Sequence, residues 1–173
     1  DDETAIDILR AGETVTMVGG SDEKGVTGLY DPFRNVKRRG YVDGIDVIEF
    51  NLNYENRFGT IKRINVFLKF AFSSIILALR EPSDVVFCTT TPLTAGFPGI
   101  AARWLKKKRF VFEVRDLWPE LPRAMGVIKN PVLLGLMSTL EFISYHSAER
   151  LVALSPGIVD GIIARKINNN RIS

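Results

Sequence analysis

Three charged side chains surround a Trp-Pro pair in the second half of the chain. Arg115, Asp116 and Glu120 follow the apolar run Phe110–Val114, with Trp118 and its proline between them. An indole can stack on a sugar ring, and carboxylates beside a guanidinium can bind hydroxyl groups or a phosphate. These residue types indicate a site for a sugar or a phosphate. A structural turn, in which Arg115 and Asp116 pair with each other, is the alternative.

Small or hydroxyl-bearing residues follow the other predicted strands. They are Gly19 and Gly20 after Thr14–Val18, Thr90 and Thr91 after Asp84–Cys88, and Ser155 after Arg150–Leu154. Ligands of open parallel sheets bind outside the carboxyl ends of the strands, so we expect these residues to line one rim together with Arg115. Plainer roles stay open, because threonine and serine are typical helix caps and a glycine pair more often marks a turn.

The elements that must position these residues alternate between strand and helix. The expected helices are Asp2–Ala11, Thr60–Arg80, Leu93–Trp104, Pro131–Ser147 and Pro156–Lys166, and the expected strands are Thr14–Val18, Ile45–Phe50, Asp84–Cys88, Phe110–Val114 and Arg150–Leu154. A long polar loop is expected over residues 21–40. Short apolar strands alternating with helices predict an α/β, Rossmann-like domain of three layers with a mostly parallel sheet.

We expect residues 1–173 to form a single domain. In a Rossmann-like sheet the first strand normally lies near the centre, and no predicted strand precedes the first helix. The pattern therefore predicts a further strand before Asp1.

The longest predicted helix, Thr60–Arg80, is apolar on more than one face. Such a helix is either buried in the core or lies partly in a membrane interface. Lys62, Arg63 and Lys69 argue against a membrane span, whereas reversible binding to an anionic membrane surface stays open. The basic run Lys106–Arg109 is expected to be solvated, and a membrane-surface role is its alternative.

The composition is that of an ordinary globular protein, with 46% hydrophobic and 25% charged residues. The net charge of +3 suits an anionic partner without identifying one. Cys88 is the only cysteine and is expected to be a small core residue. His146 is the only histidine and is expected in the last turn of a helix, where a cation interacts favourably with the helix dipole. No Walker loop, dinucleotide fingerprint or zinc signature is present, so we expect neither a metal nor a cofactor.

The run from Phe110 to Glu120, FVFEVRDLWPE, resembles the same region of bacterial family-4 glycosyltransferases of the capsule and O-antigen type, above all the fucosaminyltransferase-like members. Gly12–Val18, Thr91–Thr94 and Ala153–Gly157 support the resemblance, which covers nearly the whole chain. It implies a retaining enzyme of two Rossmann-like halves, the GT-B fold. Residues 1–173 would then be the N-terminal, acceptor-side half, and a C-terminal half outside this chain would bind the nucleotide sugar.

The resemblance also implies a hexosyltransferase that uses no metal and acts in capsule or lipopolysaccharide synthesis. Its partners would be a nucleotide sugar, a polyprenyl-diphosphate-linked saccharide and the inner face of the cytoplasmic membrane, with no nucleic acid. We expect this half to be inactive alone.

Many relatives place a histidine just after the strand equivalent to Phe110–Val114, a position held here by Arg115 or Asp116. We therefore expect Asp116 to orient the acceptor hydroxyl or contact the donor sugar, and Arg115 to bind phosphate. The substrate would be bound by Gly19, Gly20, Thr90, Thr91, Trp118, Glu120 and Ser155. Two other readings stay open: an epimerase or dehydrogenase acting on nucleotide sugars, and a non-catalytic, membrane-associated binding module.

Overall fold

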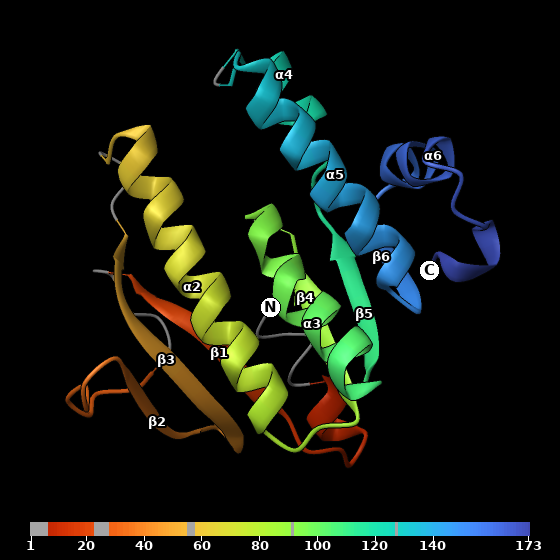
Figure 1. Cartoon of the computed structure of the whole chain (residues 1–173). Coiled ribbons are helices and arrows are strands. Elements are labelled where there is room, and N and C mark those ends of the chain that lie inside the picture. Colours follow the sequence, from red (N-terminus) through yellow and green to blue (C-terminus); the bar gives the residue numbers. More distant parts are fainter. Residues whose placement is uncertain (1–6, 23–27, 55–57, 91, 127) are drawn as a thin grey trace. The chain divides into compact units, whose positions relative to one another are not determined.

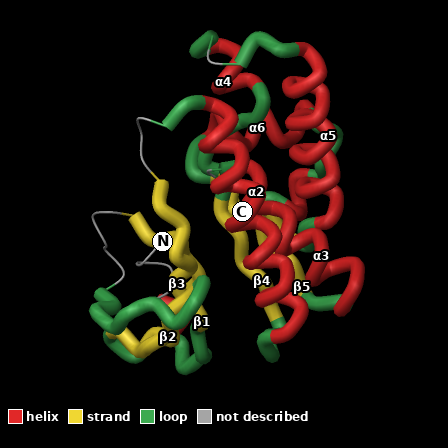
Figure 2. Tube along the Cα trace, turned by 60° about the vertical axis from the view of Figure 1, so that its left-hand side comes forward, coloured by secondary structure: helices red, strands yellow, loops and turns green. Residues whose placement is uncertain are grey.

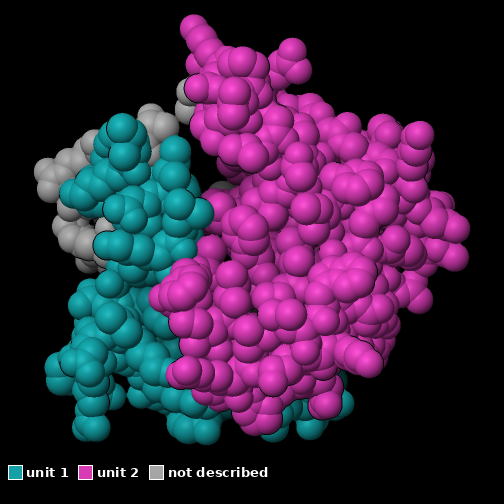
Figure 3. Space-filling model, in the orientation of Figure 1, with its two compact units in different colours: residues 1–70 teal, residues 71–173 magenta. Residues whose placement is uncertain are grey.

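The computed structural model describes residues 7–22, 28–54, 58–90, 92–126 and 128–173. Two compact units form, residues 1–70 and residues 71–173 (Figure 3). After a short helical segment at residues 7–10, the elements are β1 (Thr16–Asp22), β2 (Lys37–Val42), β3 (Ile45–Tyr54), α2 (Thr60–Arg80), β4 (Val85–Thr89), η1 (Leu93–Ala95), α3 (Gly96–Lys106), β5 (Arg109–Val114), α4 (Glu120–Ala124), α5 (Pro131–Ser147), β6 (Arg150–Ala153), α6 (Pro156–Ala164) and η2 (Asn169–Arg171).

The first unit contains a three-stranded sheet in the order β1-β3-β2. β1 runs parallel to β3, and β2 runs antiparallel to it. Leu29, Ile45 and Val47 form its buried apolar cluster. Phe50 of β3 packs edge-to-face on Phe70 of α2, with ring centroids 6.0 Å apart.

The glycine pair does not end the first strand, as the sequence predicted. β1 continues to Asp22, and Gly19 and Gly20 lie opposite Glu49 and Phe50 of β3. The ladder with β3 holds the backbone of the pair in the strand. The expectation that Gly19 and Gly20 lie in a loop after the strand is therefore wrong.

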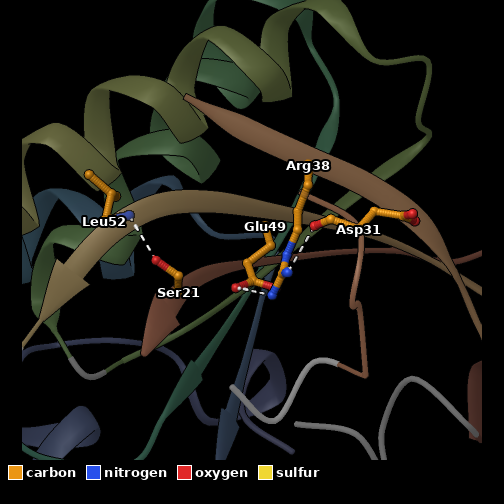
Figure 4. Close-up of polar contacts among 5 residues, drawn as sticks. All are labelled: Ser21, Asp31, Arg38, Glu49 and Leu52. Atoms are coloured by element: carbon orange, nitrogen blue, oxygen red, sulfur yellow. Dashed lines mark hydrogen bonds and ion pairs between the residues drawn. The ribbon is translucent and has the colours of Figure 1, made fainter. Parts of the chain in front are cut away.

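The predicted loop over residues 21–40 is also wrong at its end, where β2 begins at Lys37. Arg38 reaches from β2 to the buried Glu49 of β3 and donates three hydrogen bonds of 2.9–3.0 Å to its carboxylate (Figure 4). Arg39 pairs with Asp46 at 2.6 Å, and this contact lowers the pKa of Asp46. Two ion pairs across the ladder thus stabilise the pairing of this polar segment, β2, with β3.

Figure 4 shows two further hydrogen bonds that involve strands of the same sheet. Arg38 Nη1 donates to the carbonyl of Asp31 at 3.0 Å, and Leu52 N donates to Ser21 Oγ at 3.0 Å. The first bond ties the segment before β2 to that strand, and the second ties β1 to β3.

The second unit contains a fully parallel sheet in the order β4-β5-β6. Helices α3 and α5 pack against one face of it (Figures 1 and 2). Phe110 and Phe112 of β5 fill this layer, and Gly99 of α3 lies so close that an added Cβ would be 2.0 Å from Phe110. The α/β fold with a mostly parallel, Rossmann-like sheet is confirmed.

The two edges of this sheet differ. Beside β6, the C-terminal Ser173 donates to Leu151 O and accepts from Ala153 N, both at 2.9 Å. Within the described part of the chain, β4 has no ladder partner other than β5.

The basic run before β5 does more than face solvent. Lys108 Nζ donates to the carbonyls of Ala78 and Glu81 at 2.8 and 2.7 Å, at the C-terminus of α2. Arg109 pairs with Glu149 at 2.9 Å. Lys106, Lys107 and Arg109 are exposed, as expected of a solvated run. Lys108 is half-buried instead, because a cation is favourable beside the unpaired carbonyls of a helix end.

Three smaller predictions can be checked. Cys88 is buried, as expected, and burial raises its pKa to about 12. The expected helix Leu93–Trp104 is divided into η1 and α3. None of the described helices is long and apolar enough to cross a membrane.

Candidate functional site

Three parallel strands of the second unit end at one edge of their sheet. Thr89, the last residue of β4, lies opposite Glu113, and Ala153, the last residue of β6, lies opposite Val114. Since the strands are parallel, the residues that follow them emerge at the same edge. The structure thus brings Thr90, Arg115, Asp116 and Ser155 to neighbouring strand ends.

Thr90 connects β4 to the end of β5. Its Oγ1 accepts a hydrogen bond of 2.7 Å from Arg115 N, and its own N donates to Glu113 O at 2.9 Å. Thr90 is buried, so its hydroxyl serves this contact instead of capping a helix. Neither η1 nor α3 has a side-chain cap, and Thr91 lies outside the described residues.

The side chains after β5 differ in exposure. Arg115 is exposed, whereas Asp116 and Trp118 are half-buried. The indole packs against the core, but its Nε1 is buried and has no hydrogen-bond partner among the described residues. A buried N–H group without an acceptor is uncommon in folded proteins, so this indole could still bond to an oxygen of a ligand or a water.

The backbone of this loop is held in place by its neighbours. The peptide between Trp118 and Pro119 is cis, and Pro119 is buried. Leu117 fills the space above Gly161 of α6, where an added Cβ would lie 2.4 Å from Leu117 Cδ1. The loop is therefore packed against α6 as well as attached to β5.

Glu120 lies within an ion-pair network behind the loop. Its carboxylate pairs with Arg165 at the end of α6, and Arg165 Nε donates to Glu141 Oε2 of α5 at 2.8 Å. Glu141 is 1% exposed, and Tyr145 of the same helix also interacts with its carboxylate. Burial raises the pKa of Glu141 against the opposing effect of Arg165, and burial with the nearby Glu141 raises the pKa of Tyr145.

Glu141 and Arg165 were not among the sequence-predicted site residues. One signal could have identified Glu141, because it is the only acidic residue in the apolar segment Pro131–Ser147. An isolated carboxylate in such a helix needs a partner when it is buried. Its partner, Arg165, lies 24 residues further along the chain. No pattern near Arg165 indicates that it pairs with Glu141.

Two local predictions about side chains are met. Ser155 caps α6, with its Oγ accepting from Ile158 N at 3.4 Å. His146 lies in the last turn of α5, where its Nδ1 is 2.9 Å from Phe142 O and its ring stacks on Phe142. Both contacts are internal to their helices.

Gly19 and Gly20 belong to a different sheet from the residues described above. They lie inside β1, which belongs to the sheet of the first unit. In the described parts of the chain, no group of three or more His, Cys, Asp or Glu side chains could hold a metal ion.

Comparison with known families finds a match over nearly the whole chain. Residues 7–173 match the glycosyl transferase 4-like domain, so the match includes every residue that the structure describes. No curated protein matches the chain.

Proposed function

Because the chain belongs to the family of glycosyl transferase 4-like domains, we propose that it is the N-terminal, acceptor-side half of a retaining hexosyltransferase with the GT-B fold. A glycosyltransferase uses a nucleotide-sugar donor and an acceptor. The acceptor here is a polyprenyl-diphosphate-linked saccharide, and the product belongs to a bacterial capsule or to the O-antigen of lipopolysaccharide. The subtype is fucosaminyltransferase-like, and the enzyme works without a metal at the inner face of the cytoplasmic membrane.

The observation that carries the proposed position of the site is the 2.7 Å bond from Arg115 N to Thr90 Oγ1. It fixes the backbone where β5 ends, so Arg115 and Asp116 leave the sheet from a defined position. Binding groups held on rigid elements position a substrate more accurately than groups on a free loop. The edge of a parallel sheet is also where ligands of such folds bind.

Each side chain at this edge has a proposed role. Asp116 orients the acceptor hydroxyl or contacts the donor sugar, and the exposed Arg115 binds a phosphate through its planar guanidinium. Trp118 contacts the sugar ring, and Glu120, positioned by Arg165, accepts a hydrogen bond from a sugar hydroxyl. Ser155 caps α6, and the helix N-terminus that it caps favours an anion.

A transfer assay tests these roles in the complete protein. UDP-, GDP- and other nucleotide sugars are offered with a polyprenyl-diphosphate-linked saccharide in detergent, and the transferred sugar is measured. Asp116→Ala is expected to lower kcat by about 100-fold, as for loss of a group that positions a reacting hydroxyl. Arg115→Ala is expected to raise the KM of the substrate whose phosphate it binds.

The matched control is Asp160→Ala, since Asp160 is an exposed aspartate of α6. It should leave both kinetic constants unchanged, and circular dichroism should show that all three variants are folded. Normal turnover by Asp116→Ala would rule out its proposed role. Absence of transfer with every donor would count against the proposed enzyme.

A further inference from the structure

Helix α2 buries one face and exposes another. Phe70 packs on Phe50, and Ala71, Ser74 and Leu77 are buried. The sequence left open whether this helix is a core helix or an interfacial one. The buried face shows that α2 contributes to packing, as a core helix does.

The outer face of α2 is apolar although it is exposed. Ile61 is 86%, Leu68 51% and Phe72 65% exposed, and Ile64 and Ile76 also face solvent. Spacings of three, four and seven residues put these side chains in one stripe along the helix (coloured yellow to green in Figure 1). A continuous apolar stripe on a surface marks a site of interaction.

Basic side chains flank this stripe on one side. Lys62 and Lys69 are exposed and seven residues apart, so they lie in a row beside Ile61 and Leu68. Arg80 continues the row, and the helix carries no aspartate or glutamate. Lys62 is also stacked over the ring of Phe58, 3.6 Å from its centroid. An apolar stripe with only positive charges beside it complements a layer of anionic headgroups that covers an apolar interior.

We infer that the exposed stripe of α2 docks the protein on an anionic membrane, with Ile61, Leu68 and Phe72 entering the interface and Lys62 and Lys69 contacting lipid headgroups. Helices of this composition lie in the plane of the interface and bind through apolar burial together with attraction to anionic lipid. The inference deepens the proposed function and rests on it only for the kind of membrane involved. It requires no transfer chemistry.

Flotation of the protein with lipid vesicles tests this inference. One set of vesicles is pure phosphatidylcholine, and the other contains equal parts of phosphatidylcholine and phosphatidylglycerol. The variants are Ile61→Ser/Leu68→Ser, which shortens the stripe, and Lys62→Gln/Lys69→Gln, which removes two charges. The matched control is Val132→Ser/Leu136→Ser, which removes two exposed apolar side chains from α5.

The wild type is expected to bind the anionic vesicles more tightly than the neutral ones. Ile61→Ser/Leu68→Ser should weaken this binding by about tenfold or more. Lys62→Gln/Lys69→Gln should weaken binding to anionic vesicles by about fivefold for each lysine and leave binding to neutral vesicles unchanged. The α5 control should bind as the wild type does.

Several results would overturn the inference. They are equal binding of the wild type to both kinds of vesicle, no binding to either, and unchanged binding by both α2 variants. A wild type that dimerises without lipid, beside monomeric stripe variants, would show that the stripe joins two copies of the chain. The transfer assay in detergent, run in parallel, separates this inference from the proposed function, since either one can fail while the other holds.

Discussion

Removal of Arg165 is expected to destabilise the protein, because it leaves a buried carboxylate without its partner. Arg165 bonds to Glu141 at 2.8 Å, and the side chain of Glu141 is 1% exposed. Removing one partner of a buried ion pair costs about 3–5 kcal/mol. Arg165 itself is 31% exposed, so water screens one side of the pair, and we expect Arg165→Met to cost about 3 kcal/mol.

The cost depends on pH with a definite sign. Burial raises the pKa of Glu141 in the folded protein, and Arg165 opposes that rise, so the pKa is expected to rise further in Arg165→Met. A carboxyl whose pKa rises on folding stabilises the folded state when it is protonated. That stability is present below the ordinary pKa and is lost as the pH climbs through the folded pKa. The deficit of the variant should therefore be largest at neutral pH and shrink on acidification.

Urea unfolding, followed by circular dichroism at neutral and at mildly acidic pH, measures this deficit. Arg109→Met is the matched control, because Arg109 and Glu149 pair at 2.9 Å but are 63% and 35% exposed. An exposed pair is screened by water and contributes little to stability. The double variant Arg165→Met/Glu141→Leu removes both charges and should regain most of the lost stability. A cost equal to that of the control, or one that does not change with pH, would refute this reasoning.

Two predictions concern packing in the second unit. Gly99→Ala should lower the free energy of unfolding by about 1–3 kcal/mol, because the new Cβ would lie 2.0 Å from Phe110. Gly135→Ala, with nothing within 4 Å, should instead raise it by up to about 1 kcal/mol, and urea unfolding of both variants distinguishes these outcomes. Cys88 should react with a chromogenic disulfide only after unfolding, since burial raises its pKa to about 12, and rapid reaction in native buffer would contradict this.

Elements with local signals were predictable from the sequence. The helices Thr60–Arg80 and Pro131–Ser147 have the predicted bounds. In the second, Pro131 occupies the first turn and Asn130 caps it, so neighbouring residues specify where the helix begins. Strand β2 was missed because its stability comes from partners on another strand, such as the pairing of Arg38 with Glu49.

In the candidate site, too, contacts between neighbouring residues were predictable and contacts between distant residues were not. The cap by Ser155 was predictable because it uses an N–H group three residues ahead. The bond between Thr90 and Arg115 joins residues 25 apart, and no pattern near either one indicates it. Gly19 and Gly20 show the opposite error, since glycine favours turns locally while the ladder with β3 keeps them extended.

The two edges of the parallel sheet in the second unit differ in whether a further strand could pair with them. The C-terminal residues occupy the side of β6, whereas β4 has no neighbour beyond β5 in the part of the chain that is described. β4 contains neither proline nor lysine, the residues that usually discourage pairing at an edge, and its Val85 and Phe87 are exposed. The sheet is thus open to extension in one direction, and any strand that joins it, from this polypeptide or from another, would align with β4.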